Sequence, residues 1–444
     1  MFENKKVFVL GMKKSGYEVA KLLAPNNFVT ISDLSPDQDK EHIKELENLG
    51  VNIIFGEQTA NLFDETFDYL IKNPGIKNEH IYITFAKEKN IPVLNDIELG
   101  YHFLPKDIDI VGITGSNGKT TTSMIIYEML KTGNRKVHLL GNIGYPLCSE
   151  AKNVKSGDII VTELSSFQLH DIKNFKTNVA VLTNLTPTHI DFHGTFENYI
   201  TDKKRIFLNH NKNDLAIINL ENETSLELTN DIVSTKKYFS SKNPTDIYLK
   251  EDAIYYQKEK FIDVNDIKLK GTHNYENIMC AILVALYFKI AKENIIKTIK
   301  NFGGVEHRIE YVNEINGISI YNDSKSTNNE ACKTALKSFN TPVILIMGGL
   351  DRKQTFDELK DYMKYVKHIT CYGQTSDKIE LFAKNNNISC TKVLTLDKAI
   401  EDAFTKGEIG DTILFSPACA SWDQFSSYEE RGKTFKQTIK KLEQ

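Results

Sequence analysis

The clearest chemical signal in the sequence is a glycine-rich run with one lysine and two threonines, Gly115-Ser116-Asn117-Gly118-Lys119-Thr120-Thr121. Glycines let the chain wrap so that successive backbone N–H groups point at phosphate oxygens. Lys119 can reach the terminal phosphates, and Thr120 can ligate Mg²⁺. The strict pattern GxxxxGK(S/T) is not met, because its first glycine would fall on Ile113. The shorter form TGxxGKT keeps the lysine and threonine in place, so the run predicts a nucleoside triphosphate site rather than a chance glycine-rich turn.

Two further side chains have the chemistry of a metal site. Mg²⁺ accompanies triphosphates, prefers oxygen ligands and keeps several waters. Glu163 follows the apolar run 159–162, and His189 follows the run 179–182. Taken singly, each has a plainer interpretation, a surface carboxylate and a loop histidine. The carboxyl ends of strands in an open α/β sheet lie at one ligand-binding edge, so the nearby phosphate loop favours the metal site.

Short runs rich in Val and Ile must position these residues. They alternate with helix-length segments throughout the chain and occupy 7–10, 29–32, 108–114, 159–162, 179–182, 215–218, 343–347 and 412–415. Most end at Gly, Asn, Asp or Ser, which is typical of parallel strands buried on both faces and joined by crossover helices. We expect helices over 17–23 and 121–130, each after a glycine turn. The predicted class is α/β.

The order of these elements suggests three domains, at 1–99, 100–305 and 306–444. Within the second, the alternation of polar and apolar residues over 223–270 predicts antiparallel strands. The third has three strand-like runs. The boundaries rest on counting strands and helices.

The composition excludes several classes of protein. The chain has 444 residues, is 41% hydrophobic and 26% charged, and carries a net charge of -4. No global basic field would draw it to nucleic acid or to an anionic membrane. The six cysteines form no CxxC pair, which fits reduced thiols better than disulfides or a zinc site. The first apolar run is too short for a signal peptide, and no stretch reaches the roughly 20 apolar residues of a membrane span. We therefore expect a cytoplasmic protein.

A second glycine turn, Gly11-Met12-Lys13-Lys14-Ser15-Gly16, follows the first apolar run. It fails the dinucleotide fingerprint GxGxxG, because Lys13 replaces the glycine that lets backbone approach a pyrophosphate. A nicotinamide-dependent oxidoreductase is therefore disfavoured. A simple turn between a strand and a helix is the plain alternative.

Taken together, the motifs resemble the Mur ligases, the ATP-dependent amide ligases of peptidoglycan precursor synthesis, whose relatives include folylpolyglutamate synthase. They occur in family order and span nearly the whole chain. The segments are TGSNGKTT (114–121), ELSSFQ (163–168), Asn184 with His189-Ile-Asp, GTHN (271–274), EHR (306–308) and DSKSTN (323–328). The resemblance implies a Rossmann-like N-terminal domain, a central mononucleotide-binding domain with a phosphate loop and a parallel sheet, and a Rossmann-like C-terminal domain.

Other segments resemble the branch of that family that joins D-glutamate to UDP-N-acetylmuramoyl-L-alanine. They are NPGI (73–76), DIE (96–98), GGLDRK (348–353) and above all SPACASWDQF (416–425). The resemblance implies these two substrates, ATP and about two Mg²⁺ ions, and an acyl phosphate intermediate. The three separated blocks of the chain also imply domain motion that closes the site, and we expect a monomer. Ligases of the same family that add another amino acid, and a nucleotide-dependent assembly ATPase, remain the alternatives.

By the same resemblance, roles pass to individual residues. Catalysis is assigned to Lys119, His189 and Lys203, with His189 a candidate general base. Lys203 matches a carbamylated lysine, although the adjacent Lys204 leaves that assignment open by one residue. The ATP contacts are residues 115–121, Asn274, Arg308 and Asp323, and the metal ligands are Thr120, Glu163, His189 and carbamylated Lys203.

The remaining assignments concern the two other substrates. The first domain would hold the UDP end, through Ser15, Gly16, Asp33, Asn73 and, in the second domain, Asn142. The D-glutamate pocket would contain Lys325, Thr327, Lys353, Ser421 and Tyr428. Plainer interpretations exist for three of these: Lys353 as a solvated turn lysine, Lys325 as a partner of Asp323, and Ser421 as the cap of a helix beginning at 422.

Overall fold

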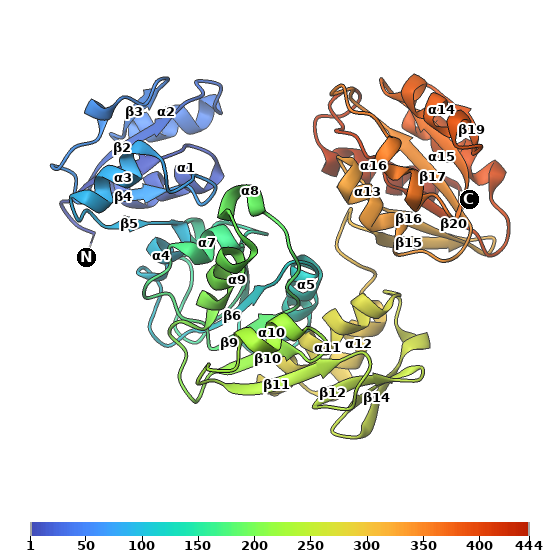
Figure 1. Ribbon diagram of the computed structural model, residues 1–444, viewed down its shortest axis with the longest axis horizontal. Coiled ribbons are helices and arrows are strands. Elements are labelled where there is room, and N and C mark those ends of the chain that lie inside the picture. The colour runs from blue at the N-terminus through green and yellow to red at the C-terminus, as the bar shows by residue number, and fades with distance from the viewer. Residues whose placement is uncertain (1, 443–444) are drawn as a thin grey trace. The chain divides into compact units, whose positions relative to one another are not determined.

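The fold is seen in a computed structural model that describes residues 2–442 (Figure 1). The described chain forms three mainly parallel sheets covered by helices, which confirms the predicted α/β class. It divides into two compact units. The first contains residues up to Asp266 together with Thr272–Lys300, and the second contains Ile267–Gly271 together with the residues from Asn301 onward.

The first sheet has five parallel strands in the order β3-β2-β1-β4-β5. Buried aliphatic and aromatic residues of β1, β2 and β4 form its core. Its elements are β1 (Lys6–Leu10), α1 (Lys14–Leu23), β2 (Phe28–Asp33), α2 (Lys40–Asn48), β3 (Asn52–Phe55), β4 (Tyr69–Lys72), α3 (Ile81–Glu88), β5 (Val93–Leu94) and α4 (Asp96–Tyr101).

The second sheet has nine strands in the order β14-β13-β12-β11-β10-β9-β6-β8-β7. Its strands are β6 (Asp109–Thr114), β7 (Val137–Gly141), β8 (Ile159–Glu163), β9 (Val179–Leu182), β10 (Leu215–Asn219), β11 (Thr235–Ser240), β12 (Ile247–Lys250), β13 (Ala253–Tyr256) and β14 (Glu259–Asp263). The helices are α5 (Lys119–Leu130), α6 (Leu147–Glu150), α7 (Ser166–His170), α8 (Ile190–His193), α9 (Phe196–Lys204), α10 (Glu223–Leu228), α11 (Thr272–Tyr287) and α12 (Lys292–Asn301).

This strand order positions the site. The central strand β6 lies between β8 and β9, and all three run parallel. The carboxyl ends of the three strands therefore meet at one edge, where residues 115–118, Glu163 and Thr183 lie.

The third sheet has six strands in the order β15-β16-β20-β17-β18-β19, and only β15 runs antiparallel to its neighbour. In Figure 1, β15 and β16 lie at one edge of this sheet and β19 at the other. The elements are β15 (Glu310–Ile315), β16 (Ile318–Asn322), α13 (Asn329–Leu336), β17 (Val343–Gly348), β18 (Val366–Tyr372), α14 (Ser376–Asn385), β19 (Ser389–Lys392), α15 (Leu396–Lys406), β20 (Thr412–Phe415) and α16 (Tyr428–Leu442).

The structure corrects several expected boundaries. Helices α1 and α5 begin at Lys14 and Lys119, earlier than expected, because the last turn residues already adopt helical geometry. Only β12 to β14 are antiparallel within 223–270, since β11 pairs parallel with both its neighbours. The third sheet has six strands rather than three. No helix begins at 422, because α16 starts at Tyr428.

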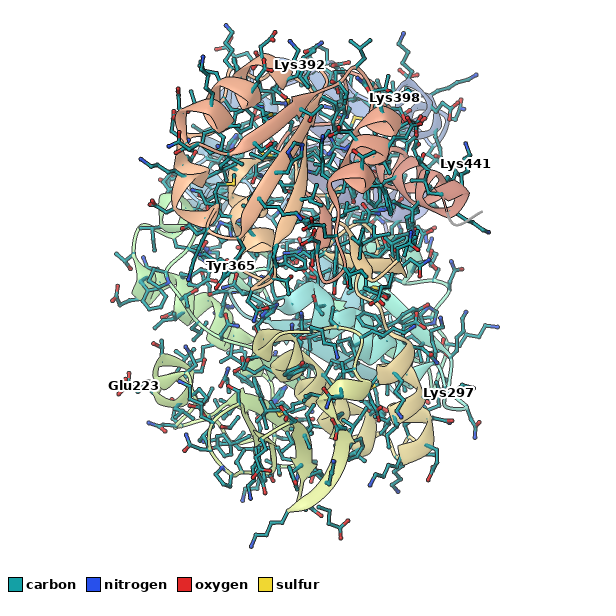
Figure 2. The ribbon with its side chains drawn as sticks, turned by 90° about the vertical axis from the view of Figure 1, so that its right-hand side faces the viewer. Glu223, Lys297, Tyr365, Lys392, Lys398 and Lys441 are labelled. Carbon is teal, nitrogen blue, oxygen red and sulfur yellow. The ribbon has the colours of Figure 1, made fainter. Side chains whose placement is uncertain are left out.

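Charged side chains cover the outer faces of the helices. Figure 2 labels Lys297 on α12, Lys398 on α15 and Lys441 on α16, all of them exposed. Ile295 and Ile299, on the other face of α12, are buried. Over residues 2–442, no helix is both long enough and apolar enough to cross a membrane. All six cysteines are free thiols.

Candidate active site

The phosphate loop runs from the end of β6 into α5, and its two glycines are required by the packing. A Cβ on Gly115 would lie 1.9 Å from Thr183 Oγ1, and one on Gly118 would lie 2.4 Å from Asn277 Oδ1. Both have positive φ, 145° and 83°. Gly118 caps α5 without a side-chain hydrogen bond to the first turn of the helix. The loop therefore has the backbone conformation that aims N–H groups at an anion.

The end of β9 holds this loop in place. The backbone N–H of Ser116 donates to Asn184 O at 2.8 Å, and that of Asn117 donates to Asn184 Oδ1 at 3.0 Å. Thr183 Oγ1 donates to Asn117 O at 2.6 Å. Lys119 Nζ donates to Gly115 O at 2.8 Å and to Ser116 O at 3.0 Å. The lysine is thus held over the loop that it would serve.

Glu163, the last residue of β8, is a buried carboxylate, and one of its two oxygens accepts no hydrogen bond. Its side chain is 2% exposed, and Asn142 Nδ2 donates to Oε1 at 2.7 Å. Oε2 is buried and accepts no hydrogen bond. An unsatisfied buried carboxylate oxygen is costly, and a cation would satisfy it. The described residues hold no cluster of three or more His, Cys, Asp or Glu suited to a metal. One carboxylate and Thr120 still fit Mg²⁺, which takes its other ligands from water and phosphates.

Lys203 lies behind the loop in an enclosed position. It is 1% exposed, its Nζ donates to Thr114 Oγ1 at 3.1 Å, and it lies 4.9 Å from the ring centre of Tyr199. Burial, reinforced by the charge of Lys119, holds the pKa of Lys203 well below its ordinary value. Lys204 instead pairs with Asp231 at 2.7 Å on the outer side of α9. Of the two lysines, Lys203 is the one beside the phosphate loop.

His189 is exposed and occupies the N-cap of α8 with a left-handed φ of 55°. Its ring lies 5.2 Å from that of Phe167, centre to centre. Asn274, on α11, is joined to α5 through Asn277, whose Oδ1 accepts from Thr122 Oγ1 at 3.1 Å. The structure therefore brings residues 115–121, Glu163, Asn142 and Lys203 together around the end of β6, with Asn274 reaching the same helix.

Two adjoining cavities lie in the same unit. The first, of about 310 Å³, is lined by Gly11, Lys13, Asp33, Leu34, Gln58, Asn73, Gly75, Ile76 and His80. The second, of about 260 Å³, is lined by Lys14, Ser15, Asn73, Pro74, Gly75, Gly141, Asn142, Gly144, Pro146, Ser165, Phe167 and Gln168. Asn73 and Gly75 line both. Four of the five residues predicted for the UDP substrate thus face these cavities.

The fifth, Gly16, has a packing role. A Cβ there would lie 1.8 Å from Gly11 O, so only glycine lets α1 start this close to the turn. Asp33 fixes the same turn by accepting the backbone N–H of Met12 at 2.7 Å. Ser15 Oγ donates to Asp96 Oδ2 at 3.2 Å, and burial raises the pKa of Asp96 to about 6.

In the second unit, Asp323 is buried at the end of β16. Ser416 Oγ donates to its Oδ2 at 2.7 Å, and burial raises its pKa to about 7. Arg308 is exposed, and its positive charge lowers the pKa of the same carboxyl. Arg431, fully buried, joins two predicted segments by donating to Ser324 O at 2.7 Å and Cys419 O at 3.0 Å.

The residues predicted for D-glutamate are only partly brought together. Lys325 Nζ lies 5.8 Å from the ring centre of Tyr428. Ser421 is buried, and its carbonyl accepts the N–H groups of Gln424 and Phe425 in a tight turn, so it does not cap a helix. Lys353 lies in an exposed turn at φ 66°, where its backbone N–H donates to Asp351 Oδ1 at 2.8 Å.

The rim of this region carries an aromatic contact. Trp422 is 63% exposed, and the Arg352 guanidinium lies 4.7 Å from its ring centre.

Sequence reasoning did not single out Tyr199, whose hydroxyl lies 2.8 Å from Ser116 Oγ in the phosphate loop. A signal was present, because Tyr199 precedes Lys203 by four residues and so shares its face of α9. Thr183 and Arg431 make their supporting contacts through tertiary packing, so no spacing in the sequence indicates them.

Comparison with known proteins identifies the family. Residues 113–285 match the family described as Mur ligase middle domain, and residues 307–419 match Mur ligase, glutamate ligase domain. The UDP-N-acetylmuramoylalanine--D-glutamate ligase of Bacillus cereus (strain G9842) is 40% identical over 445 residues, covering 99% of this chain and 98% of the relative. The chain belongs to the Mur ligase family. A second ligase of the same name, from Geobacillus kaustophilus (strain HTA426), is 41% identical to this Mur ligase over 446 residues, with coverage of 99% and 98%.

Solved structures share the fold of this Mur ligase. MurF from Acinetobacter baumannii aligns with a TM-score of 0.60 at 15% identity, covering 97% of this chain and 93% of that one. UDP-N-acetylmuramate-alanine ligase MurC from Thermotoga maritima aligns at 0.58 with 17% identity, covering 99% and 100%. MurF from Thermotoga maritima, solved in complex with ADP, aligns at 0.57 with 20% identity, covering 99% of both chains.

Proposed function

We propose that this Mur ligase joins D-glutamate to UDP-N-acetylmuramoyl-L-alanine at the expense of ATP, as a step of peptidoglycan precursor synthesis. Full-length relatives at 40% and 41% identity carry the name of this activity. The observation in the structure that carries the proposal is the grouping of a phosphate loop, the unsatisfied Oε2 of Glu163 and the buried amine of Lys203. This grouping suits chemistry on a triphosphate.

The reaction follows from the electrophile that amide formation needs. A carboxylate is a poor electrophile at neutral pH, so the L-alanyl carboxylate first attacks the γ-phosphorus of ATP, giving an acyl phosphate and ADP. The amine of D-glutamate then attacks the acyl carbon, and inorganic phosphate leaves from the tetrahedral intermediate. Lys119 neutralises charge on the transferred phosphoryl group, and the loop N–H groups orient it. The attacking amine must lose a proton to a general base, and His189 is a candidate contributor to that step.

The metal and the modified lysine form one part of the proposal. Thr120, Glu163, His189 and carbamylated Lys203 would hold Mg²⁺, which supplies charge neutralisation at the phosphates. The depressed pKa of Lys203 favours the neutral amine, which is the form that captures CO₂ as a carbamate. The carbamate would be an additional anionic oxygen ligand. Lys203 is preferred to Lys204, which is engaged with Asp231.

The substrates are assigned to the three predicted domains. Residues 1–99 would bind the UDP end through Ser15, Asp33 and Asn73, with Gly16 shaping the turn, and Asn142 would contact the muramoyl group. Residues 100–305 would bind ATP, together with Arg308 and Asp323 of the third domain. Residues 306–444 would bind D-glutamate through Lys325, Thr327, Lys353, Ser421 and Tyr428. We further propose a cytoplasmic monomer that binds neither nucleic acid nor membrane.

The test is incubation with ATP, Mg²⁺, UDP-N-acetylmuramoyl-L-alanine and one amino acid at a time, with products weighed by mass spectrometry. We expect a new amide with D-glutamate and phosphate release that depends on it. A product with another amino acid would assign the chain to a different substrate. ATP hydrolysis indifferent to every amino acid would overturn the ligase.

A further inference from the structure

Asp202, on α9 beside Lys203, is a buried carboxylate bound by two histidines. It is 7% exposed. Oδ1 lies 2.8 Å from His170 Nδ1, and Oδ2 lies 3.0 Å from His193 Nδ1. The two rings come from α7 and α8, so one carboxylate joins three helices.

Each histidine continues the network through its other nitrogen. His170 Nε2 lies 2.5 Å from Asn78 Nδ2, a donor in the first domain, and His193 Nε2 lies 2.9 Å from Ser166 Oγ. An amide N–H₂ only donates, so His170 Nε2 accepts and its Nδ1–H donates to Asp202. Burial lowers the pKa of His193. The network is thus a fixed chain of hydrogen bonds from Asn78 to Ser166, centred on Asp202.

The order Ser166–His193–Asp202 has the connectivity of a hydrolase triad, but it lacks access to a substrate. Ser166 is 2% exposed, and it is absent from the lining of the 260 Å³ cavity, where its neighbours Ser165 and Phe167 lie. A nucleophile must reach its electrophile. The arrangement therefore holds helices rather than cleaving bonds.

What it holds is the helix that serves the phosphate site. On α9, Tyr199 reaches Ser116 of the phosphate loop at 2.8 Å, and Lys203 reaches Thr114 at the end of β6 at 3.1 Å. On α7, Phe167 lines the substrate cavity and stacks on His193, with ring centres 5.4 Å apart and planes 4° from parallel. Asp202 connects the helix that lines the substrate cavity to the helix that carries the phosphate-site residues.

We infer that Asp202 is a positioning residue, which fixes Lys203 against the phosphate loop by binding α9 to α7 and α8 through His170 and His193. This rests on the proposed function, since it assigns Asp202 a task in ligation. Outer contacts that orient a ligand typically contribute 10–100-fold to metal affinity or activity. Asp202 acts through Lys203 and touches no substrate.

The test is Asp202→Asn, which keeps the size of the side chain but replaces one acceptor oxygen by a donor. We expect kcat to fall by about 10–100-fold while KM for ATP changes less than about threefold. The matched control is Asp231→Asn, which removes a carboxylate that binds the same helix from outside through Lys204. It should leave kcat within about twofold, because exposed ion pairs contribute little.

A second measurement separates positioning from plain stability. With ¹³C-bicarbonate, the carbamate signal of the ligand-free protein should be weaker in Asp202→Asn than in the parent, and raising bicarbonate should restore part of kcat. An equal carbamate signal, or a kcat loss that bicarbonate leaves unchanged, would overturn the inference. If Asp202→Asn does not fold, His193→Gln removes only the contact between His193 and Asp202, and kcat and the carbamate signal are measured in the same way. Absence of D-glutamate ligation in the parent would refute the proposed function instead.

Discussion

The chain contains two strand–turn–helix units that are alike in backbone and different in charge. In one, β1 leads through Gly11 into α1, and in the other, β6 leads through Gly115 and Gly118 into α5. Both helices begin with a lysine, and neither has a side-chain cap. Each turn is fastened by a residue at the end of the neighbouring strand.

The fastening residues differ. At the first turn the Asp33 carboxylate accepts the N–H of Met12 at 2.7 Å, and at the second the neutral amide of Asn184 accepts the N–H of Asn117 at 3.0 Å. A carboxylate this close to the turn repels a chain of phosphates but suits the hydroxyl or ring N–H groups of a nucleoside. We therefore propose that the charge at the end of the neighbouring strand, rather than the glycine pattern, separates the proposed triphosphate site from the proposed nucleoside site. Four changes test this comparison.

The largest effect should come from Lys119→Ala. The lysine is held over the loop 115–121, so its loss would remove the cation proposed to face the transferred phosphoryl group. We expect kcat for ligation to fall by on the order of 10³-fold, measured as phosphate release dependent on D-glutamate. Lys131→Ala, at the exposed far end of α5, is the control and should leave kcat within about twofold. Near-normal turnover of Lys119→Ala would refute the assignment of the loop.

Asn184→Asp gives the second turn the charge of the first. The new carboxylate would still accept the N–H of Asn117, would lose the bond that Asn184 Nδ2 donates to Asn117 O at 3.2 Å, and would repel phosphate. We expect KM for ATP to rise by about 10²-fold, with an unchanged KM for the UDP substrate. An unaltered KM for ATP would show that the fastening residue does not select the ligand.

Asp33→Asn makes the converse change in the first turn. Loss of one charge-assisted hydrogen bond should raise KM for the UDP substrate by about tenfold. KM for ATP and kcat should stay the same, as steady-state kinetics can show. A rise in KM for ATP instead would contradict the placement of the two ligands.

The smallest effect concerns stability at Asp96, beneath the first turn. Its folded-state pKa is raised by burial to about 6, from an ordinary 3.8. The protonated form is therefore favoured in the fold, and stability is lost as pH rises through about 6. Asp96→Asn keeps an acceptor for Ser15 and should remove this loss, raising stability at pH 8 by on the order of 1 kcal/mol. The loss falls between about pH 4 and 6, so calorimetric Tm between pH 4 and 7 measures it, with the exposed Asp37→Asn as control. A parent Tm that does not fall over this range would contradict the sign.

The sequence predicted where the loop 115–121 and Glu163 lie, because both follow buried strands and parallel strands end at one edge of the sheet. Their roles in binding ATP and metal stay predictions, and so does the metal role of the exposed His189. The network of Asp202 could not be predicted in this way. Its members are separated by up to 124 positions, from Asn78 to Asp202, and meet only because three helices and the turn that carries Asn78 pack together.

The expected starts of helices α1 and α5 were wrong because one residue belongs to both the turn and the helix. Lys14 and Lys119 were placed in the glycine turns, yet each is the first helical residue. Ser421 has the residue type of a helix cap, but it is buried in a tight turn whose carbonyl accepts two N–H groups. Cap propensity is a local preference, and burial at the end of the third sheet overrides it.

The position of Trp422 determines where the tryptophan fluorescence of this enzyme originates. It is the one tryptophan in the sequence, and it is 63% exposed with the Arg352 guanidinium 4.7 Å from its ring centre. The indole emission of the whole chain therefore originates within the segment proposed to bind D-glutamate. A ligand that displaces the guanidinium or excludes water from the ring will shift the wavelength and intensity of that emission, so occupancy of the amino-acid site can be followed by fluorescence in the unlabelled protein.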